Sequence, residues 1–205
     1  MAERMVGTDG YASEADDLFK RYESLSPQEV HRLVLHLMPS APARVLDIGA
    51  GTGRDAAWFA ALGHKVVAVE PTDALRFGAM ALHASPRIAW IDDGLPELAV
   101  VRAQREQFDL IMMTAVFMHL DAGERARAMP HIASLLVPGA KLIMRLRHGP
   151  VPAGRRMFDI EAGEIIALAK PLGLRLMLDH RGGSIGAQNL AAGVSWTTLA
   201  FVKDA

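Results

Sequence analysis

Asp47 ends an aliphatic run of the sequence, and three glycines follow it at alternate positions, Gly49, Gly51 and Gly53. A helical pattern begins directly after them at Arg54. Glycine allows a backbone to turn sharply and to come close to a ligand, and the first turn of a helix leaves N–H groups without partners. This succession of strand, loop and helix predicts a site that binds a nucleoside cofactor.

The spacing of the glycines separates two kinds of cofactor loop. The dinucleotide fingerprint is G-x-G-x-x-G, whereas this chain has D-x-G-x-G-x-G from Asp47 to Gly53. That pattern resembles motif I of the class I S-adenosylmethionine-dependent methyltransferases, in which the loop, here including Ala50, wraps the amino-acid part of the cofactor. The resemblance implies S-adenosylmethionine as cofactor, S-adenosylhomocysteine as product, and direct in-line methyl transfer that needs no metal. An NAD-dependent oxidoreductase is the distant alternative.

Acidic residues at the ends of later strands extend the resemblance. Glu70, followed by Pro71, ends the second expected strand, where a carboxylate can accept hydrogen bonds from ribose hydroxyls. In the family, an acid after the third strand contacts adenine. Asp92 and Asp93 are both candidates for this contact, and Asp92 is favoured. Thr114, at the end of the fourth strand, is expected to lie beside the cofactor. Arg54, directly after the glycines, is expected to reach the cofactor carboxylate or to seal the cleft.

His119 is the candidate catalytic residue, because it follows the fourth strand by a few residues. An imidazole can remove a proton from a hydroxyl or an amine near neutral pH. The alternative is that its ring hydrogen-bonds a backbone group and shapes the loop. Both interpretations stay open at this point.

A basic cluster follows the fifth expected strand, with Arg145, Arg147, His148 and Arg155 close together. One interpretation is a site for an acidic substrate, because guanidinium groups bind carboxylate and phosphate through paired hydrogen bonds. The other is that the strand ends by Met144 and that the cluster belongs to a solvated loop.

Alternating patterns place strands at 44–48, 65–70, 87–92, 109–114, 140–146, 174–179 and 195–202, with helices in most intervals. This alternation predicts an α/β fold, a Rossmann-like seven-stranded mostly parallel sheet with helices on both faces. No clear helix separates the last two strands, which indicates a C-terminal antiparallel β-hairpin. Ligands of such sheets lie outside the carboxyl ends of the strands.

Residues 1–40 are expected to form a helical lead or lid, and residues 41–205 the Rossmann-like core, within a single class I methyltransferase domain. One helix is expected over 13–23. A second should begin at a cap on Ser26, with Glu29 completing a capping box, and should end before Pro39. Residues 1–9 are expected to fray, although Gly7, Gly10 and Tyr11 alternatively belong to a lid over the cofactor.

The composition of the chain limits the classes of function that it can have. The chain has 205 residues, no cysteine and a net charge of -1, which argues against nonspecific nucleic-acid binding. No run approaches the ~20 apolar residues of a membrane span, and no signal peptide is evident, so the expected location is the cytoplasm.

The expected substrate is a small molecule, and the basic cluster makes an acidic one a candidate. An RNA or protein methyltransferase and an inactive cofactor-binding protein are the alternatives, and the oligomeric state stays open.

Overall fold

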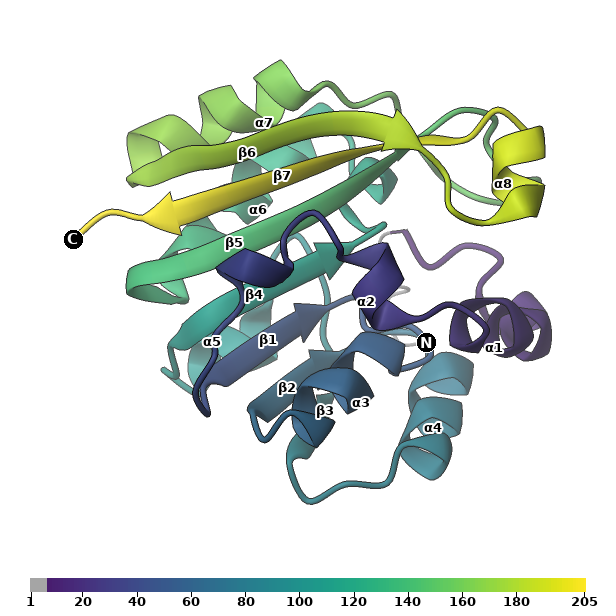
Figure 1. Ribbon diagram of the computed structural model, residues 1–205, viewed down its shortest axis with the longest axis horizontal. Helices are drawn as coiled ribbons and strands as arrows, with labels where there is room; N and C mark the ends of the chain where they lie inside the picture. The colour runs from purple at the N-terminus through teal and green to yellow at the C-terminus, as the bar shows by residue number, and fades with distance from the viewer. Residues whose placement is uncertain (1–6) are drawn as a thin grey trace.

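The computed structural model describes residues 7–205 and has an α/β architecture with helices on both faces of one sheet (Figure 1). The strand order is β3-β2-β1-β4-β5-β7-β6. The strands are β1 (Arg44–Ile48), β2 (Lys65–Val69), β3 (Ile88–Ile91), β4 (Phe108–Thr114), β5 (Leu136–His148), β6 (Leu174–Gly183) and β7 (Ser195–Lys203). The α-helices are α1 (Ala15–Glu23), α2 (Pro27–Val30), α3 (Arg54–Ala61), α4 (Asp73–Leu82), α5 (Ala99–Ala103), α6 (Ala122–Ser134), α7 (Ala162–Ala169) and α8 (Ala187–Ala191). Short 3-10 helices are η1 (Ala12–Glu14), η2 (Leu35–Leu37), η3 (Phe117–His119) and η4 (Lys170–Leu172).

The sheet confirms the predicted fold class. Strands β3, β2, β1, β4 and β5 pair in parallel, and β7 lies antiparallel between β5 and β6. The connection between β6 and β7 differs from the prediction, because it contains the short helix α8. The helix occupies five residues between Gly186 and Gly193, and Gly193 adopts a positive φ of 74° that ends it.

Strand β5 is longer than predicted at both ends. Its pairing with β7 continues to His148, which lies opposite Ser195. The interpretation in which this strand ends by Met144 is therefore wrong: Arg145 and Arg147 lie in the sheet, whereas Arg155 lies in the loop that follows it. At the other end, β5 begins before Pro138, and a register shift between Phe108 and the rest of β4 absorbs the additional residues.

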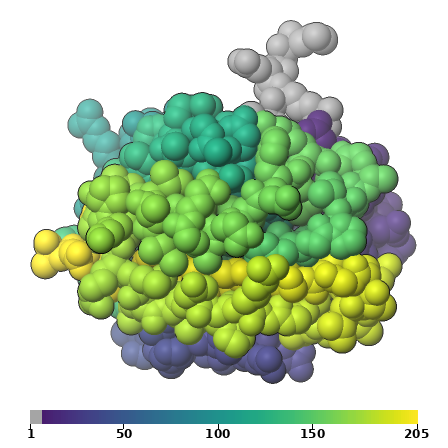
Figure 2. All heavy atoms as spheres, turned by 90° about the horizontal axis from the view of Figure 1, so that it is seen from above, coloured from purple at the N-terminus to yellow at the C-terminus, as the bar shows by residue number. Residues whose placement is uncertain are grey.

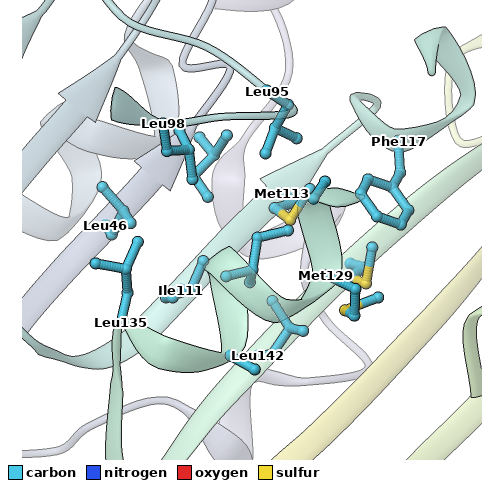
Figure 3. Packing of buried hydrophobic residues seen from close by; sticks show 14 of the residues in the cluster. Leu46, Leu95, Leu98, Ile111, Met113, Phe117, Met129, Leu135 and Leu142 are labelled. Carbon is cyan, nitrogen blue, oxygen red and sulfur yellow. The ribbon is translucent and has the colours of Figure 1, made fainter. Parts of the chain in front are cut away.

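Two apolar layers hold the sheet between its helices. Leu46 and Ile48 of β1 pack into the cluster that also contains Met129 of α6 (Figure 3). Val45 points to the opposite face, where it packs with Phe59 of α3. Successive strand residues alternate between faces, so one strand serves both layers. Seen from above, the green-to-yellow late segments lie between teal segments on one side and blue N-terminal segments on the other (Figure 2).

The N-terminal lead is helical, but its second helix is shorter than predicted. Helix α1 agrees with the expected range, and Ser26 caps α2 through its hydroxyl. Helix α2 then ends after one turn, and the Glu29 side chain forms no capping box there. The chain turns because His31 is drawn into the interior, where its Nε2 lies 2.8 Å from Oδ2 of Asp55. Among residues 7–205, no helix has the length and apolar character to cross a membrane.

Candidate active site

A cavity of about 270 Å³ lies where the parallel strands end, the position expected for ligands of an open α/β sheet. Helices α1 and α8 lie at the same end of the sheet (Figure 1). Most of the residues predicted from the sequence line this cavity: Asp47, Gly49, Ala50, Gly51, Arg54, Glu70, Pro71, Thr114, His119, Arg145, Arg147 and Arg155. Residues far apart in the sequence are thus brought to one site.

The two acids predicted to contact adenine do not line the cavity. Asp92 is exposed and forms an ion pair of 3.2 Å with Arg76. Asp93 is buried, but its carboxylate accepts hydrogen bonds from the backbone N–H groups of Gly94 and Val101, which orders the start of α5. The neighbouring Gly94 and Leu95 line the cavity instead. A third-strand acid can therefore shape this wall without facing the ligand space.

Gly53 and His148 also lie outside the cavity lining. Gly53 caps α3 with a φ of 85°, and a Cβ there would lie 2.8 Å from the Trp90 ring. Its role is therefore the turn and the close packing of the loop. His148 ends β5, and its Nε2 lies 2.8 Å from the Thr197 hydroxyl oxygen. The structure thus separates His148 from Arg145 and Arg147 of the same strand, which line the cavity.

The glycine loop and Glu70 form one wall of the cavity. Gly49 has a φ of 69°, and a Cβ there would lie 2.6 Å from Val116, so no other residue fits. The N–H of Gly51 donates to Oε2 of Glu70 over 2.8 Å, and the N–H of Thr72 donates to Oε1 over 2.8 Å. Burial raises the pKa of Glu70, although these two hydrogen bonds oppose it. The carboxylate is therefore fixed at the edge of the ligand space.

The pKa values of two buried aspartates beneath the glycine loop, Asp47 and Asp55, are shifted in opposite directions. Burial, followed by the charge of Asp55, raises the pKa of Asp47 well above its ordinary value. Burial alone would raise the pKa of Asp55 as well, but His31 and Arg54 outweigh it and hold that pKa below its usual range. Within residues 7–205, Oδ2 of Asp47 has no hydrogen-bond partner. The cavity floor thus contains a buried acceptor that a polar ligand group can satisfy.

His119 is held by two hydrogen bonds that define its tautomer. Its Nδ1 lies 2.7 Å from the carbonyl oxygen of Arg156, so Nδ1 carries the proton. Its Nε2 lies 2.9 Å from the Tyr11 hydroxyl and accepts that O–H. Burial lowers the pKa of His119, and the charges of Arg155 and Arg147 lower it further, against the carbonyl of Arg156. The His119 ring is thus neutral, and its basic nitrogen, Nε2, faces Tyr11 of the N-terminal lead. Both sequence interpretations of His119 find support here.

The N-terminal lead packs over the cavity, and the Arg155 side chain binds it there. The Arg155 guanidinium stacks on the Tyr11 ring at 3.7 Å, donates to the Asp9 carbonyl over 2.9 Å and donates to the Glu14 carboxylate over 2.8 Å. A Cβ on Gly7 would lie 2.8 Å from Cβ of His119. Residues 1–9 were expected to fray, but residues 7–9 lie against the site. Residues 1–6 lie outside the described residues.

Helix α1 adds a second attachment of the lead. Oε1 of Glu23 accepts the hydroxyl of Thr52 over 2.5 Å, and Oε2 of Glu23 lies 3.2 Å from Nε2 of His83. Thr52 belongs to the glycine loop, so α1 is bonded directly to the predicted cofactor site.

Sequence reasoning did not identify several cavity residues, among them Tyr22 and Trp196. It also missed His31, which bonds Asp55 beneath the cavity floor. A signal for His31 exists, because a histidine stands within an otherwise apolar helical face, beside Val30 and Val34. Trp196 has no such signal, since an aromatic residue is ordinary in a strand. Among residues 7–205, no group of three or more histidine, aspartate or glutamate side chains is arranged to hold a metal ion.

Comparison with known proteins agrees with this geometry. A family model described as a methyltransferase domain matches residues 18–181. A search of curated proteins found no significant match. Among solved structures, 1,6-didemethyltoxoflavin-N1-methyltransferase of Burkholderia thailandensis, with 1,6-didemethyltoxoflavin and S-adenosylhomocysteine bound, is 20% identical. The match covers 95% of this chain and 86% of that chain, with a TM-score of 0.70.

Two further structures show the same architecture. The N-methyltransferase NodS of Bradyrhizobium japonicum, in complex with S-adenosylhomocysteine, has a TM-score of 0.71 at 16% identity, and the match covers 95% of this chain and 99% of that chain. A TehB-like S-adenosylmethionine-dependent methyltransferase of Corynebacterium glutamicum has a TM-score of 0.68 at 21% identity, with 94% and 99% covered. The family match and the shared fold together lead to one conclusion: the chain belongs to the methyltransferase-domain family and has the class I methyltransferase fold.

Proposed function

We propose that this protein is an S-adenosylmethionine-dependent methyltransferase that acts on a small molecule. The observation that carries the proposal is the wall in which Gly51 donates to Glu70 beside a glycine loop that tolerates no side chain at Gly49. A carboxylate at this position suits ribose hydroxyls. Oδ2 of Asp47, which has no hydrogen-bond partner among residues 7–205, suits an ammonium group. These residues fit a nucleoside that carries an amino acid and a positive charge.

The cofactor would be held by the residues that meet at this wall. The glycine loop, with Asp47 beneath it, would take the amino-acid part, and Glu70 would take the ribose. The backbone of Gly94 and Leu95, which lines the cavity, would take the place that the sequence assigned to Asp92 or Asp93 beside adenine. When bound, S-adenosylmethionine supplies an electrophilic methyl group on its sulfonium, so the protein acts mainly by alignment.

We propose that His119 is the base that takes up the proton of the methyl acceptor, and that Tyr11 relays this proton to it. The Tyr11 hydroxyl donates to Nε2 of His119, and both residues line the cavity. The Tyr11 oxygen accepts the proton of the acceptor's O–H or N–H group, and the Tyr11 proton moves to Nε2. The reaction then leaves a methylated acceptor, neutral Tyr11 and an imidazolium on His119. Burial of Tyr11 raises its pKa, so the hydroxyl stays protonated between turnovers.

A small acceptor is favoured because the lead closes one side of the cavity through Tyr11, Leu18 and Tyr22, and the α8 connection lines another through Ile185 and Asn189. The related structure from Burkholderia thailandensis binds a small molecule beside S-adenosylhomocysteine. A cavity covered on two sides in this way favours a small molecule over an RNA or protein chain.

Transfer of a labelled methyl group tests the proposal without a chosen acceptor. The protein is incubated with methyl-labelled S-adenosylmethionine and with separated small-molecule, RNA and protein fractions of a cell extract. We expect label in the small-molecule fraction alone. Label in RNA or protein would contradict the assignment of a small acceptor. Absence of label from every fraction, in a protein that binds S-adenosylhomocysteine, would identify an inactive cofactor-binding protein.

A further inference from the structure

Two arginines of β5 point into the cavity from the same face of the sheet. Arg145 lies opposite Thr198 of β7, and Arg147 lies opposite Trp196. Residues two apart on a strand share a face, and both side chains line the cavity. The Arg145 guanidinium lies 4.8 Å from the centre of the Trp196 ring. The aromatic ring therefore packs against this guanidinium in the cavity wall.

Neither arginine forms a salt bridge within the described part of the chain, residues 7–205. Arg145 is 8% exposed, and its buried Nε has no hydrogen-bond partner among residues 7–205. Arg147 donates from Nη1 to the Pro150 carbonyl over 2.9 Å. Burial lowers the pKa of Arg145 to about 10, and the charge of Asp55 only partly opposes this effect. A charged guanidinium in such a place is costly unless an anion joins it.

The acids of the cavity are committed to other groups or to the proposed cofactor wall. Asp55 bonds His31 and Arg54, and Glu14 bonds Arg155. Glu70 accepts two backbone N–H groups at the glycine loop, which also covers Asp47. An anionic ligand in the cavity would give the β5 arginines a partner that these acids do not provide.

The walls beside the pair describe the rest of that ligand. Trp196, Tyr22 and Ile185 offer aromatic and aliphatic surface, whereas Ser184 and Asn189 are the neutral polar groups of the α8 connection. Guanidinium groups present paired N–H donors that match the two oxygens of a carboxylate. An apolar body next to an anionic group is therefore the chemistry that this part of the cavity accepts.

We propose that Arg145 and Arg147 form a carboxylate subsite and that the methyl acceptor is a small carboxylic acid with a flat, apolar body. The inference rests on the proposed function only for the statement that this acid is the acceptor. The subsite lies on β5, whereas the proposed cofactor wall is formed at the ends of β1 and β2. The subsite can therefore be tested by binding alone.

The experiment is a titration of the protein with benzoate and with its neutral analogue benzamide, in the presence of S-adenosylhomocysteine. Binding is followed by NMR at the indole N–H of Trp196, whose nitrogen lies 3.3 Å from the Ser184 hydroxyl oxygen. We expect benzoate to bind and benzamide to bind at least about tenfold more weakly, because the neutral amide cannot form the charge-assisted hydrogen bonds that a carboxylate forms with guanidinium groups.

Variants locate the subsite. Arg145→Gln and Arg147→Gln are each expected to weaken benzoate binding by about tenfold or more. Arg175→Gln is the matched control, because it removes the same charge from an exposed position on β6. It should leave benzoate binding unchanged. If Arg145→Gln does not fold, Arg147→Gln decides the result, because Arg147 is only half-buried.

Three results would overturn the inference: equal binding of benzoate and benzamide, no binding of benzoate, or unchanged benzoate affinity in the folded β5 variants. Affinity for S-adenosylhomocysteine is measured on every variant first. Loss of that affinity in Arg145→Gln would assign Arg145 to the cofactor and would also overturn the subsite. If the unaltered protein binds no S-adenosylhomocysteine, the proposed function fails, and the benzoate titration of the free protein still decides the subsite.

Discussion

Burial and charged neighbours together shift the pKa values of the acids beneath the cavity. Asp47 and Asp55 are both buried aspartates, yet burial raises the pKa of the first, and His31 with Arg54 lowers the pKa of the second. A motif identifies Asp47 from the sequence alone, because its place before the glycines is characteristic. The partners that separate the two acids come from α3 and the turn after α2 and depend on tertiary packing.

The contact between Tyr11 and His119 predicts a measurable change in the pKa of His119. The Tyr11 hydroxyl donates to Nε2, which favours the neutral ring, and burial lowers the pKa of His119 below its ordinary value of 6.5. Tyr11→Phe removes this donor, so the pKa should rise towards 6.5. The ring would then be neutral, and able to accept a proton, only at higher pH. NMR titration of the His119 ring nitrogens measures the change.

Tyr22→Phe is the matched control, because Tyr22 also lines the cavity, whereas the hydroxyl bonded to Nε2 of His119 is that of Tyr11. It should leave the His119 pKa unchanged. In the label-transfer assay, His119→Asn should slow methyl transfer by about 10²-fold or more. An unaltered His119 pKa in Tyr11→Phe would show that the hydroxyl does not control the base.

At the scale of elements, local patterns predicted most helices and strands. Asp121 and Glu124 form a capping box at the start of α6, a local pattern that is visible in the sequence. The patterns were wrong where tertiary contacts dominate. Helix α2 stops early because His31 turns inward to Asp55, and β5 extends to His148 because β7 pairs with it. No local sequence signal describes either partner.

The N-terminal lead should open more often when the Arg155 side chain that binds it is removed. Arg155 holds residues 9–14 through the Asp9 carbonyl, the Glu14 carboxylate and the Tyr11 ring. Arg155→Ala should therefore speed amide hydrogen exchange in residues 8–14 by about tenfold or more, because local opening costs less free energy. Arg102→Ala, at an exposed position on α5, is the control. Unchanged exchange in residues 8–14 would assign the closure to other contacts.

At the scale of the whole molecule, the sheet brings together groups that are distant in the sequence. Alternating strands and helices were enough to predict a mostly parallel sheet with an antiparallel end. The site was predictable where one strand and its loop supply the residues, as from Asp47 to Gly51. The contact of Tyr11 with His119 joins residues 108 positions apart and could not be predicted, because it depends on how the lead folds back over the sheet.

The central claim is that the wall formed by the glycine loop and Glu70 binds the adenosyl cofactor. Calorimetric titration with S-adenosylhomocysteine tests it most directly, with NAD as the competing ligand and Glu97→Ala as an exposed control for Glu70→Ala. We predict that the protein and the control bind S-adenosylhomocysteine and not NAD. Glu70→Ala should lose at least about tenfold in affinity, because hydrogen bonds to the charged carboxylate are lost. Binding of NAD alone, or equal S-adenosylhomocysteine affinity in Glu70→Ala, would contradict the account.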